Sequence, residues 1–279
     1  MKLGLTVRNM GPQSSAKLMR GAVAAAEQAG FESVWITDHI AIPPDDAEGS
    51  GGRYTDPLTT LAWLGGTTQS IKLGTAALIL PYRPALPTAK GIATVAELTG
   101  DRLLLGVGIG WMDAEFNALG VDRHQRGRLT DDCLDLIQRC FSDSVVSENG
   151  QEFLFDPKPA LPPIYIGGAA PHALRRALRY NSGWLPMARS AEKLAPALAQ
   201  FSQLAEQAER EPGPVTVLTG IDSNDPATAA EQLLAYHALG VERTVCAMRY
   251  DTLGQYQQLL GNLAEAKALM PIETERLSP

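Results

Sequence analysis

The sequence lacks the features that mark several large classes of protein. No apolar run reaches the roughly 18 residues that a membrane-spanning helix needs. Basic residues are not in excess, because 24 Lys and Arg stand against 31 Asp and Glu and the net charge is −7. We therefore expect neither nucleic acid nor a membrane as a partner. The first residues carry no apolar h-region of a signal peptide, so we expect a cytoplasmic protein.

Cysteine and histidine are also scarce, and their spacing does not suit a metal ion. The three cysteines form no C-x-x-C pair, and Cys133 and Cys140 would share one face of a helix. The four histidines show neither H-x-x-x-H nor H-E-x-x-H spacing. We therefore expect buried thiols and no metal site.

What the sequence does have is a regular alternation of β-prone and helical segments. Strands are expected at residues 2–7, 33–37, 72–80, 102–107, 163–166, 184–186, 215–220 and 243–247. Helices are expected at residues 14–29, 86–98, 113–119, 131–141, 171–179, 191–209, 227–239 and 253–268. This alternation favours a single (β/α)8 TIM barrel over residues 1–279. An open doubly wound sheet is the alternative.

Two expected loops, residues 41–56 and 142–162, are longer than a barrel requires. The second contains Asn149-Gly150 between two β-prone runs, which is a good signal for a hairpin. We therefore expect a short β-hairpin insertion before strand five, and not a second domain.

The fourth expected strand ends in Gly106, Gly108 and Gly110, each separated by one residue. Glycine at a strand end lets a ligand or another backbone segment come close. A dinucleotide fingerprint would read G-x-G-x-x-G, but Trp111 stands where the last glycine should be. The run therefore predicts the side wall of a barrel mouth, with Trp111 lining a substrate pocket.

Polar residues follow several expected strands, at the end of a barrel where catalysis takes place. Asp38-His39 follows the second strand. One interpretation is a histidine that donates a hydrogen bond or moves a proton, with Asp38 orienting it. The other is a capping aspartate beside an exposed histidine. The small residues after Lys72 leave room for a flat ring, or simply fill a tapering barrel.

The fifth strand runs through a glycine turn at residues 167–171 into a helix that begins with proline. Free N–H groups at such a helix start bind phosphate, and Arg175 and Arg176 would add positive charge if they face the mouth. An ordinary connecting turn is the alternative.

Two aromatic–basic pairs, Arg53-Tyr54 and Tyr82-Arg83, are expected at the rim. One interpretation is that each pair meets a charged or aromatic ligand, and the other is that each pair is simply solvated. Glu115 suits the first turn of a helix, which indicates a structural role.

Six segments taken in order resemble the bacterial-luciferase-like family of flavin and deazaflavin barrels. They are Gly30-Phe31-Glu32-Ser33-Val34-Trp35, Asp38-His39, Lys72-Leu73-Gly74-Thr75, Gly106-Val107-Gly108-Ile109-Gly110-Trp111, Glu115-Phe116-Asn117-Ala118-Leu119-Gly120 and Pro162-Pro163-Ile164-Tyr165-Ile166-Gly167-Gly168. The match covers nearly the whole chain. The Gly-Trp, Glu-Phe and Leu-Gly pairs are most similar to the branch that uses coenzyme F-420, an 8-hydroxy-5-deazaflavin.

The resemblance implies positions for the cofactor. The ring would lie over the barrel mouth, against a bulge whose non-proline cis peptide bond would join Ala76 to Ala77. His39 matches the histidine that approaches the ring and is the expected catalytic residue. The cofactor-binding residues implied are Asp38, His39, Thr75, Ala76, Ala77, Gly108, Gly110, Gly167, Gly168 and Ala169, the last three receiving the phosphate. Tyr54 and Trp111 are the expected substrate-pocket residues.

The activity implied is hydride transfer between the deazaflavin C5 and a small organic substrate, with the cofactor carrying the chemistry. An FMN-dependent monooxygenase supplied by a separate flavin or deazaflavin reductase is a second possibility, and a non-catalytic flavin-binding sensor is a third. Trp111 stands where related sugar-phosphate dehydrogenases place a carboxylate, which argues against their substrate. A homodimer is expected from the resemblance alone.

Overall fold

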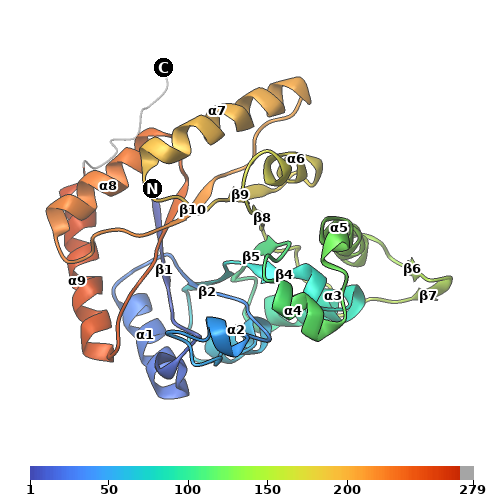
Figure 1. Ribbon diagram of the computed structural model, residues 1–279, viewed down its shortest axis with the longest axis horizontal. Helices are drawn as coiled ribbons and strands as arrows, with labels where there is room; N and C mark the ends of the chain where they lie inside the picture. The colour runs from blue at the N-terminus through green and yellow to red at the C-terminus, as the bar shows by residue number, and fades with distance from the viewer. Residues whose placement is uncertain (271–279) are drawn as a thin grey trace.

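Eight parallel strands arranged in one ring form the centre of the computed structural model, which describes residues 1–270 (Figure 1). The strands in chain order are β1 (Lys2–Thr6), β2 (Ser33–Ile36), β3 (Lys72–Thr75), β5 (Leu103–Gly108), β8 (Ile164–Gly167), β9 (Gly183–Leu185), β10 (Thr216–Thr219) and β11 (Arg243–Cys246). Around the ring they follow the order β10, β11, β1, β2, β3, β5, β8, β9. Parallel bridges from Trp184 to Val215 and from Met187 to Leu218 close it. The predicted TIM barrel is confirmed; residues 271–279 of the predicted range lie outside the described residues.

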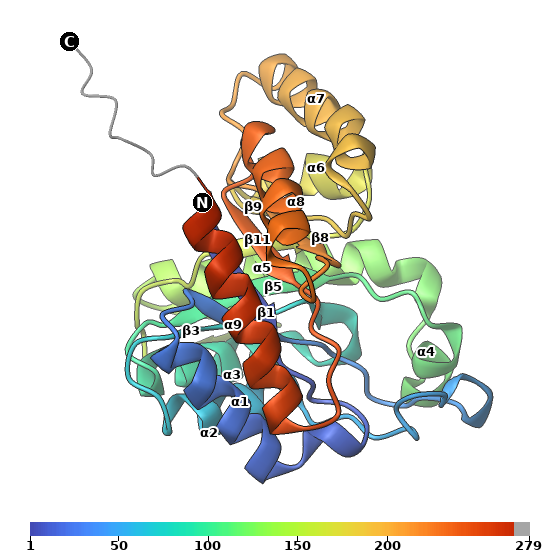
Figure 2. The same ribbon diagram turned by 90° about the vertical axis from the view of Figure 1, so that its left-hand side faces the viewer.

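Helices cover the outside of the barrel, and α9 packs against α1 and α8 (Figure 2). They are α1 (Ala16–Gln28), α2 (Pro57–Gly65), α3 (Ala85–Leu98), α4 (Asp113–Leu119), α5 (Arg126–Ser142), α6 (His172–Arg179), α7 (Ala191–Gln207), α8 (Pro226–Ala238) and α9 (Leu253–Leu269). Side-chain caps begin several of them, such as Ser15 on α1 and Thr252 on α9, where a capping box forms. Within residues 1–270, none of the helices combines the length and apolarity needed to cross a membrane.

Two helices differ from the prediction. No helix was expected at α2, although Asp56-Pro57 supplies the same cap and N1 proline as Asp225-Pro226 on α8. Helix α5 begins at Arg126, before the predicted start at residue 131. Asp131 is an internal residue of this helix, and its carboxylate forms an ion pair with Arg176 of α6.

The third strand is not continuous over residues 72–80, as the sequence predicted. It divides into β3 and the short β4 (Leu78–Ile79), which both pair with β5. Between them the Ala76–Ala77 peptide bond is cis, which confirms the position implied by the resemblance. The hydroxyl of Thr75 donates to the carbonyl of Gly106 over 2.7 Å, fixing this bulge against β5.

The predicted hairpin is present before β8. Strands β6 (Val146–Glu148) and β7 (Gln151–Phe153) are antiparallel and joined by Asn149 and Gly150, both with positive φ. These are the conformations of a tight type I′ turn, which Asn-Gly favours. In Figure 1 the hairpin projects beyond α5, away from the ring.

Trp35 is fully buried and fills the barrel interior. A Cβ added to Gly74 would lie 2.4 Å from its ring, and one added to Gly4 would lie 2.7 Å from its Nε1. The indole N–H donates to Ser33 Oγ over 2.9 Å, and Tyr165 packs edge-on with 6.1 Å between ring centroids. Gly74 therefore serves barrel packing, as the tapering-barrel interpretation held, and not the ligand.

A buried ion pair closes the opposite, amino-terminal end of the barrel. Arg243 is 1% exposed and donates from two guanidinium nitrogens to Glu32, over 2.9 Å each. It also donates to Tyr165 Oη and Thr216 Oγ1 over 2.9 Å. Burial acts to lower the pKa of Arg243, but these partners outweigh it and raise the pKa above its usual value.

Removing the charge of Glu32 should therefore weaken the fold. Glu32→Gln leaves the buried guanidinium with only the more distant, partly exposed Glu242 at 3.7 Å, and we expect the free energy of unfolding to fall by about 2–3 kcal/mol. Urea denaturation measures this. Asp132→Asn, which breaks the exposed pair between Arg128 and Asp132, should cost less than about 0.5 kcal/mol. Equal losses in both variants would contradict the assigned role of Arg243.

Candidate functional site

A cavity of about 390 Å³ opens at the carboxyl ends of the strands. Nine of the predicted site residues line it together: Asp38, His39, Ala76, Ala77, Gly108, Gly110, Trp111, Gly167 and Gly168. Three others lie outside its lining. Thr75 is buried beneath the bulge, Ala169 is exposed on the turn after β8, and Tyr54 packs against the His39 ring with 4.8 Å between centroids.

Glycines keep two walls of this cavity free of side chains. A Cβ on Gly108 would lie 2.9 Å from Ile79 Cδ1 and 3.4 Å from Ala77 Cβ, and one on Gly167 would lie 2.9 Å from the Val107 carbonyl oxygen. Such contacts are tighter than ordinary packing. Both glycines line the cavity, so this part of its wall carries no large side chain, and a larger residue at either position would collide with these neighbours.

The other two glycines of the run have different roles. A Cβ on Gly106 would lie 2.0 Å from the Thr75 carbonyl oxygen, so this glycine is required by barrel packing. Gly110 has φ +77°, a conformation that residues with a side chain rarely adopt, at the turn into α4. Within the run, Gly106 therefore serves barrel packing, Gly108 forms part of the cavity wall and Gly110 forms a turn.

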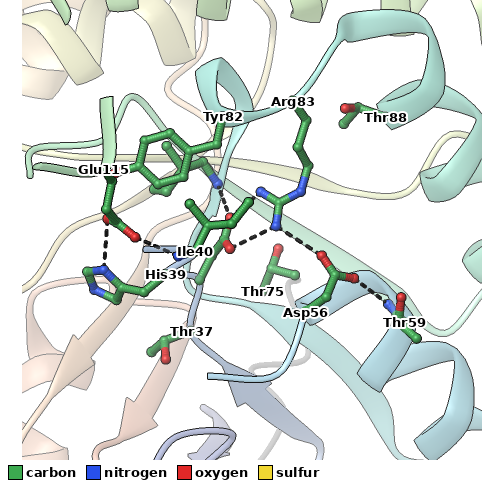
Figure 3. A network of polar contacts seen from close by, with 12 residues as sticks. Thr37, His39, Ile40, Asp56, Thr59, Thr75, Tyr82, Arg83, Thr88 and Glu115 are labelled. Carbon is green, nitrogen blue, oxygen red and sulfur yellow. Dashed lines mark hydrogen bonds and ion pairs between the residues drawn. The ribbon is translucent and has the colours of Figure 1, made fainter. Parts of the chain in front are cut away.

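Glu115 holds His39 in place (Figure 3). The carboxylate is fully buried and accepts from His39 Nδ1 over 3.0 Å and from the Tyr82 hydroxyl over 2.7 Å. It also accepts from the backbone N–H groups of Ile40 and Ala41, over 2.5 and 3.1 Å. Glu115, on helix α4, therefore contacts residues of two loops that follow strands.

This contact fixes which nitrogen of His39 faces the cavity. An ionised carboxylate only accepts hydrogen bonds, so Nδ1 must carry the proton. Burial acts to raise the pKa of Glu115, but the donors from Ile40, Tyr82 and Ala41 outweigh it and hold the pKa below its usual value. Nε2 has no hydrogen-bond partner within residues 1–270 and remains available to a ligand.

The expectation that Asp38 orients His39 is wrong. Asp38 is 4% exposed, and its carboxylate accepts from the backbone N–H of Ile79 over 2.8 Å and from Arg83 over 2.6 and 2.9 Å. Arg83 continues to Asp56, the N-cap of α2, over 3.0 Å (Figure 3). Asp38 thus fixes the loops after the second and third strands, while Glu115 does the orienting.

The solvated interpretation of Tyr82-Arg83 is also wrong. Tyr82 is 6% exposed, and both burial and its hydrogen bond to the Glu115 carboxylate raise its pKa, so its hydroxyl stays protonated as a donor. Burial acts to lower the pKa of Arg83, but its bonds to Asp38 and Asp56 outweigh it and raise the pKa. Arg53 also has partners, since it donates to Ser14 Oγ over 2.8 Å.

The rim of the cavity is open and apolar. Trp111 is 65% exposed and packs edge-on to His39 with 6.1 Å between ring centroids. Met187, which follows β9, also lines the cavity and is 82% exposed. Side chains of this kind at the entrance offer apolar surface that a ligand can cover.

The turn after β8 differs in part from expectation. Gly168 has φ +119°, and its carbonyl accepts from the Trp184 indole over 2.9 Å. Arg176 does not serve the mouth, because it pairs with Asp131 over 2.7 Å on the outside of the barrel. Arg175 is exposed on α6. Within the described residues, no three His, Cys, Asp or Glu side chains come together as a possible metal site.

Replacing Glu115 should release the ring of His39. In Glu115→Gln the amide can donate as well as accept, so we expect the Nδ1–H tautomer of neutral His39 to give way to a mixture of tautomers. Long-range ¹H–¹⁵N NMR spectra of the imidazoles measure this. Asp113→Asn changes an exposed carboxylate on the same helix and should leave the spectrum unchanged. An unaltered tautomer in Glu115→Gln would contradict the assignment.

A family model described as luciferase-like monooxygenase matches residues 4–267. The F-420-dependent hydroxymycolic acid dehydrogenase of Mycobacterium tuberculosis is 34% identical over 219 residues, which is 74% of this chain and 59% of that protein. The chain therefore spans little more than half the length of that relative.

Two solved structures share the fold. An F-420-dependent secondary alcohol dehydrogenase in complex with an F-420–acetone adduct has a TM-score of 0.77 at 16% identity, over 95% of this chain and 98% of that one. The oxygenating constituent of 3,6-diketocamphane monooxygenase from Pseudomonas putida, in complex with FMN, has a TM-score of 0.78 at 15% identity, over 98% and 100%.

Proposed function

Since the chain belongs to the luciferase-like monooxygenase family, we propose that it is a coenzyme F-420-dependent oxidoreductase. It exchanges a hydride with a small organic substrate, an alcohol in one direction and the corresponding carbonyl compound in the other. Residues 1–279 act as one domain. The names of two relatives support the cofactor: besides the dehydrogenase, an F-420-dependent glucose-6-phosphate dehydrogenase of Nakamurella multipartita is 31% identical over 68% of this chain.

The observation that carries the proposal is the fixed orientation of His39. Its Nδ1 is bound to a buried carboxylate, and its Nε2 lies free on a cavity walled by glycine. A buried carboxylate behind an imidazole both selects the tautomer and stabilises the imidazolium. A group held in this way is suited to taking up and returning a proton.

The residues of the cavity fit a deazaflavin ring. Ala76 and Ala77 at the cis bulge line the cavity together with Gly108 and Gly167, so no large side chain stands on this part of its wall. In the proposal they hold the ring, and the turn from Gly167 to Ala169 receives the phosphate. When bound, the deazaflavin supplies a two-electron hydride acceptor or donor at C5.

His39 supplies the proton chemistry. In alcohol oxidation Nε2 accepts the hydroxyl proton, and in carbonyl reduction it returns that proton to the oxygen. Glu115 stabilises the imidazolium that forms, and it remains ionised because its four donors outweigh its burial. Trp111 and Tyr54 pack against the ring of His39 and, in the proposal, exclude water from the reacting end of the substrate.

Cofactor binding is the first test. In fluorescence titrations we expect coenzyme F-420 to bind with a micromolar dissociation constant and FMN to bind at least about tenfold more weakly, a difference of about 1.4 kcal/mol. The reverse order would favour an FMN-dependent monooxygenase. Binding of neither cofactor would overturn both activities.

Substitution of His39 is the second test. We expect His39→Ala to lower kcat about 10²- to 10⁴-fold, as for loss of a general acid–base, with the dissociation constant of coenzyme F-420 changed less than threefold. Asp113→Asn is the matched control and should keep full activity. Undiminished turnover in His39→Ala would remove its catalytic role. A wild-type protein that binds the cofactor but turns over no alcohol or carbonyl compound would indicate a sensor.

The proposal also covers cofactor recycling, the cellular compartment and the oligomeric state. Its cofactor must be recycled, so a separate flavin or deazaflavin reductase is the implied partner, and the cytoplasm is the implied compartment. A homodimer completes the proposal. Light scattering at micromolar protein concentration distinguishes it from a monomer.

A further inference from the structure

A second and larger cavity, of about 700 Å³, adjoins the first. It lies over the carboxyl ends of β10, β11 and β1, whereas the glycine-walled cavity lies over β2 through β9. Thr37 and Leu218 line both. The two cavities therefore share a boundary, and His39, two residues after Thr37, stands near it.

Polar side chains contribute much of this second cavity, and its charge is positive. Arg8 and Asp251 both line it and lie 3.9 Å apart, and Asp251 also accepts from Gln13 over 2.7 Å. Arg249 lines the cavity, is exposed and has no hydrogen bond or ion pair within residues 1–270. One guanidinium therefore remains without a counter-charge.

Two acidic residues of the loop after β10, Asp222 and Asp225, form no ion pair with Arg249 within the described residues. Asp222 accepts from the backbone N–H of Asn224 over 3.2 Å, and Asp225 caps the first turn of α8. Neither lines the cavity.

A second arginine without a partner in the described residues follows β9. The N–H of Ala188 donates to the carbonyl of Leu218 over 3.2 Å, which places the following residue, Arg189, beside Leu218. Arg189 is exposed and has no partner within the described part of the chain. Arg189 lines neither cavity, so within the described residues Arg249 is the unpaired charge of this mouth, and it attracts anions in a chain with a net charge of −7.

We propose that the second cavity binds the anionic end of the substrate, a carboxylate or phosphate held by Arg249. The alcohol or carbonyl carbon at the other end of the substrate then reaches His39 across Thr37. This inference rests on the proposed function for its reacting end. The inference implies that the substrate is a small polar anion. The cavity has room for several hydroxyl or amide groups on that substrate.

The tail of coenzyme F-420 also carries anionic groups and is the second candidate ligand for Arg249. The topology favours the substrate, because the turn proposed for the cofactor phosphate follows β8. That strand lies across the ring from β11 and β1, where the second cavity opens. A ring bound in the glycine-walled cavity with its phosphate over β8 leaves the second cavity free.

Inorganic phosphate is the first probe, and calorimetry measures its binding to the protein both with and without coenzyme F-420. We expect millimolar binding to the wild type, at least about tenfold weaker binding to Arg249→Met and intermediate binding to Arg249→Lys. Arg20→Met is the matched control, because Arg20 is also exposed and unpaired but lies on α1. Equal phosphate binding by Arg249→Met and the wild type overturns the inference.

Two further measurements identify the source of the anion. Arg249→Met should bind coenzyme F-420 and tail-less 8-hydroxy-5-deazariboflavin as the wild type does; a loss confined to coenzyme F-420 assigns the cavity to the cofactor tail and overturns the substrate assignment. With 4-hydroxypentanoate and 2-pentanol as a matched pair, kcat/KM should favour the anion at least about tenfold, and Arg249→Met should abolish that preference through KM.

Failure of the inference and failure of the proposed function give different results. If the protein does not bind coenzyme F-420 but its phosphate binding still depends on Arg249, the function is wrong and the anion site stands. If coenzyme F-420 binds and phosphate binding ignores Arg249, the anion site is wrong and the function stands.

Discussion

The buried carboxylate of Glu115 is the contact on which the mouth of this barrel depends. A carboxylate without solvent is costly unless its oxygens are satisfied by donors. Here two backbone N–H groups, a tyrosine hydroxyl and an imidazole provide them. Because these donors come from separate loops, the ionisation of one side chain and the geometry of the mouth are mutually dependent.

Asp38 and His39 are adjacent in the chain but belong to two different networks. Asp38 points to Ile79 and Arg83, and His39 points to Glu115. The side chains of consecutive residues at a strand end leave in different directions. One residue can therefore set the loop framework while its neighbour remains available for a ligand.

Much of the fold could be predicted from the sequence, because alternation of β-prone and helical segments is a local property. The hairpin followed from Asn149-Gly150, and even the missed helix α2 carried a readable start at Asp56-Pro57. The interruption at Ala76–Ala77 could be placed only through family resemblance, since nothing local distinguishes it from a continuous strand.

The sequence predicted which residues line the site but not which of their side chains contact one another. Most of the cavity-lining residues were placed by the family resemblance, together with the rule that ligands bind at the carboxyl ends of barrel strands. The partner of His39 was not, because Glu115 lies 76 positions away in sequence and reaches it only when α4 folds over the mouth. Its buried carboxylate resembled an ordinary first-turn residue of a helix. Adjacency in sequence pointed instead to Asp38.

The exposed rim has a thermodynamic consequence. Trp111 and Met187 leave large apolar side chains in water at the entrance of the cavity. A ligand that covers them removes this surface from water, and the removal of apolar surface lowers the heat capacity of the system. The enthalpy of binding at this mouth therefore becomes more favourable as the temperature rises, whichever molecule the mouth receives.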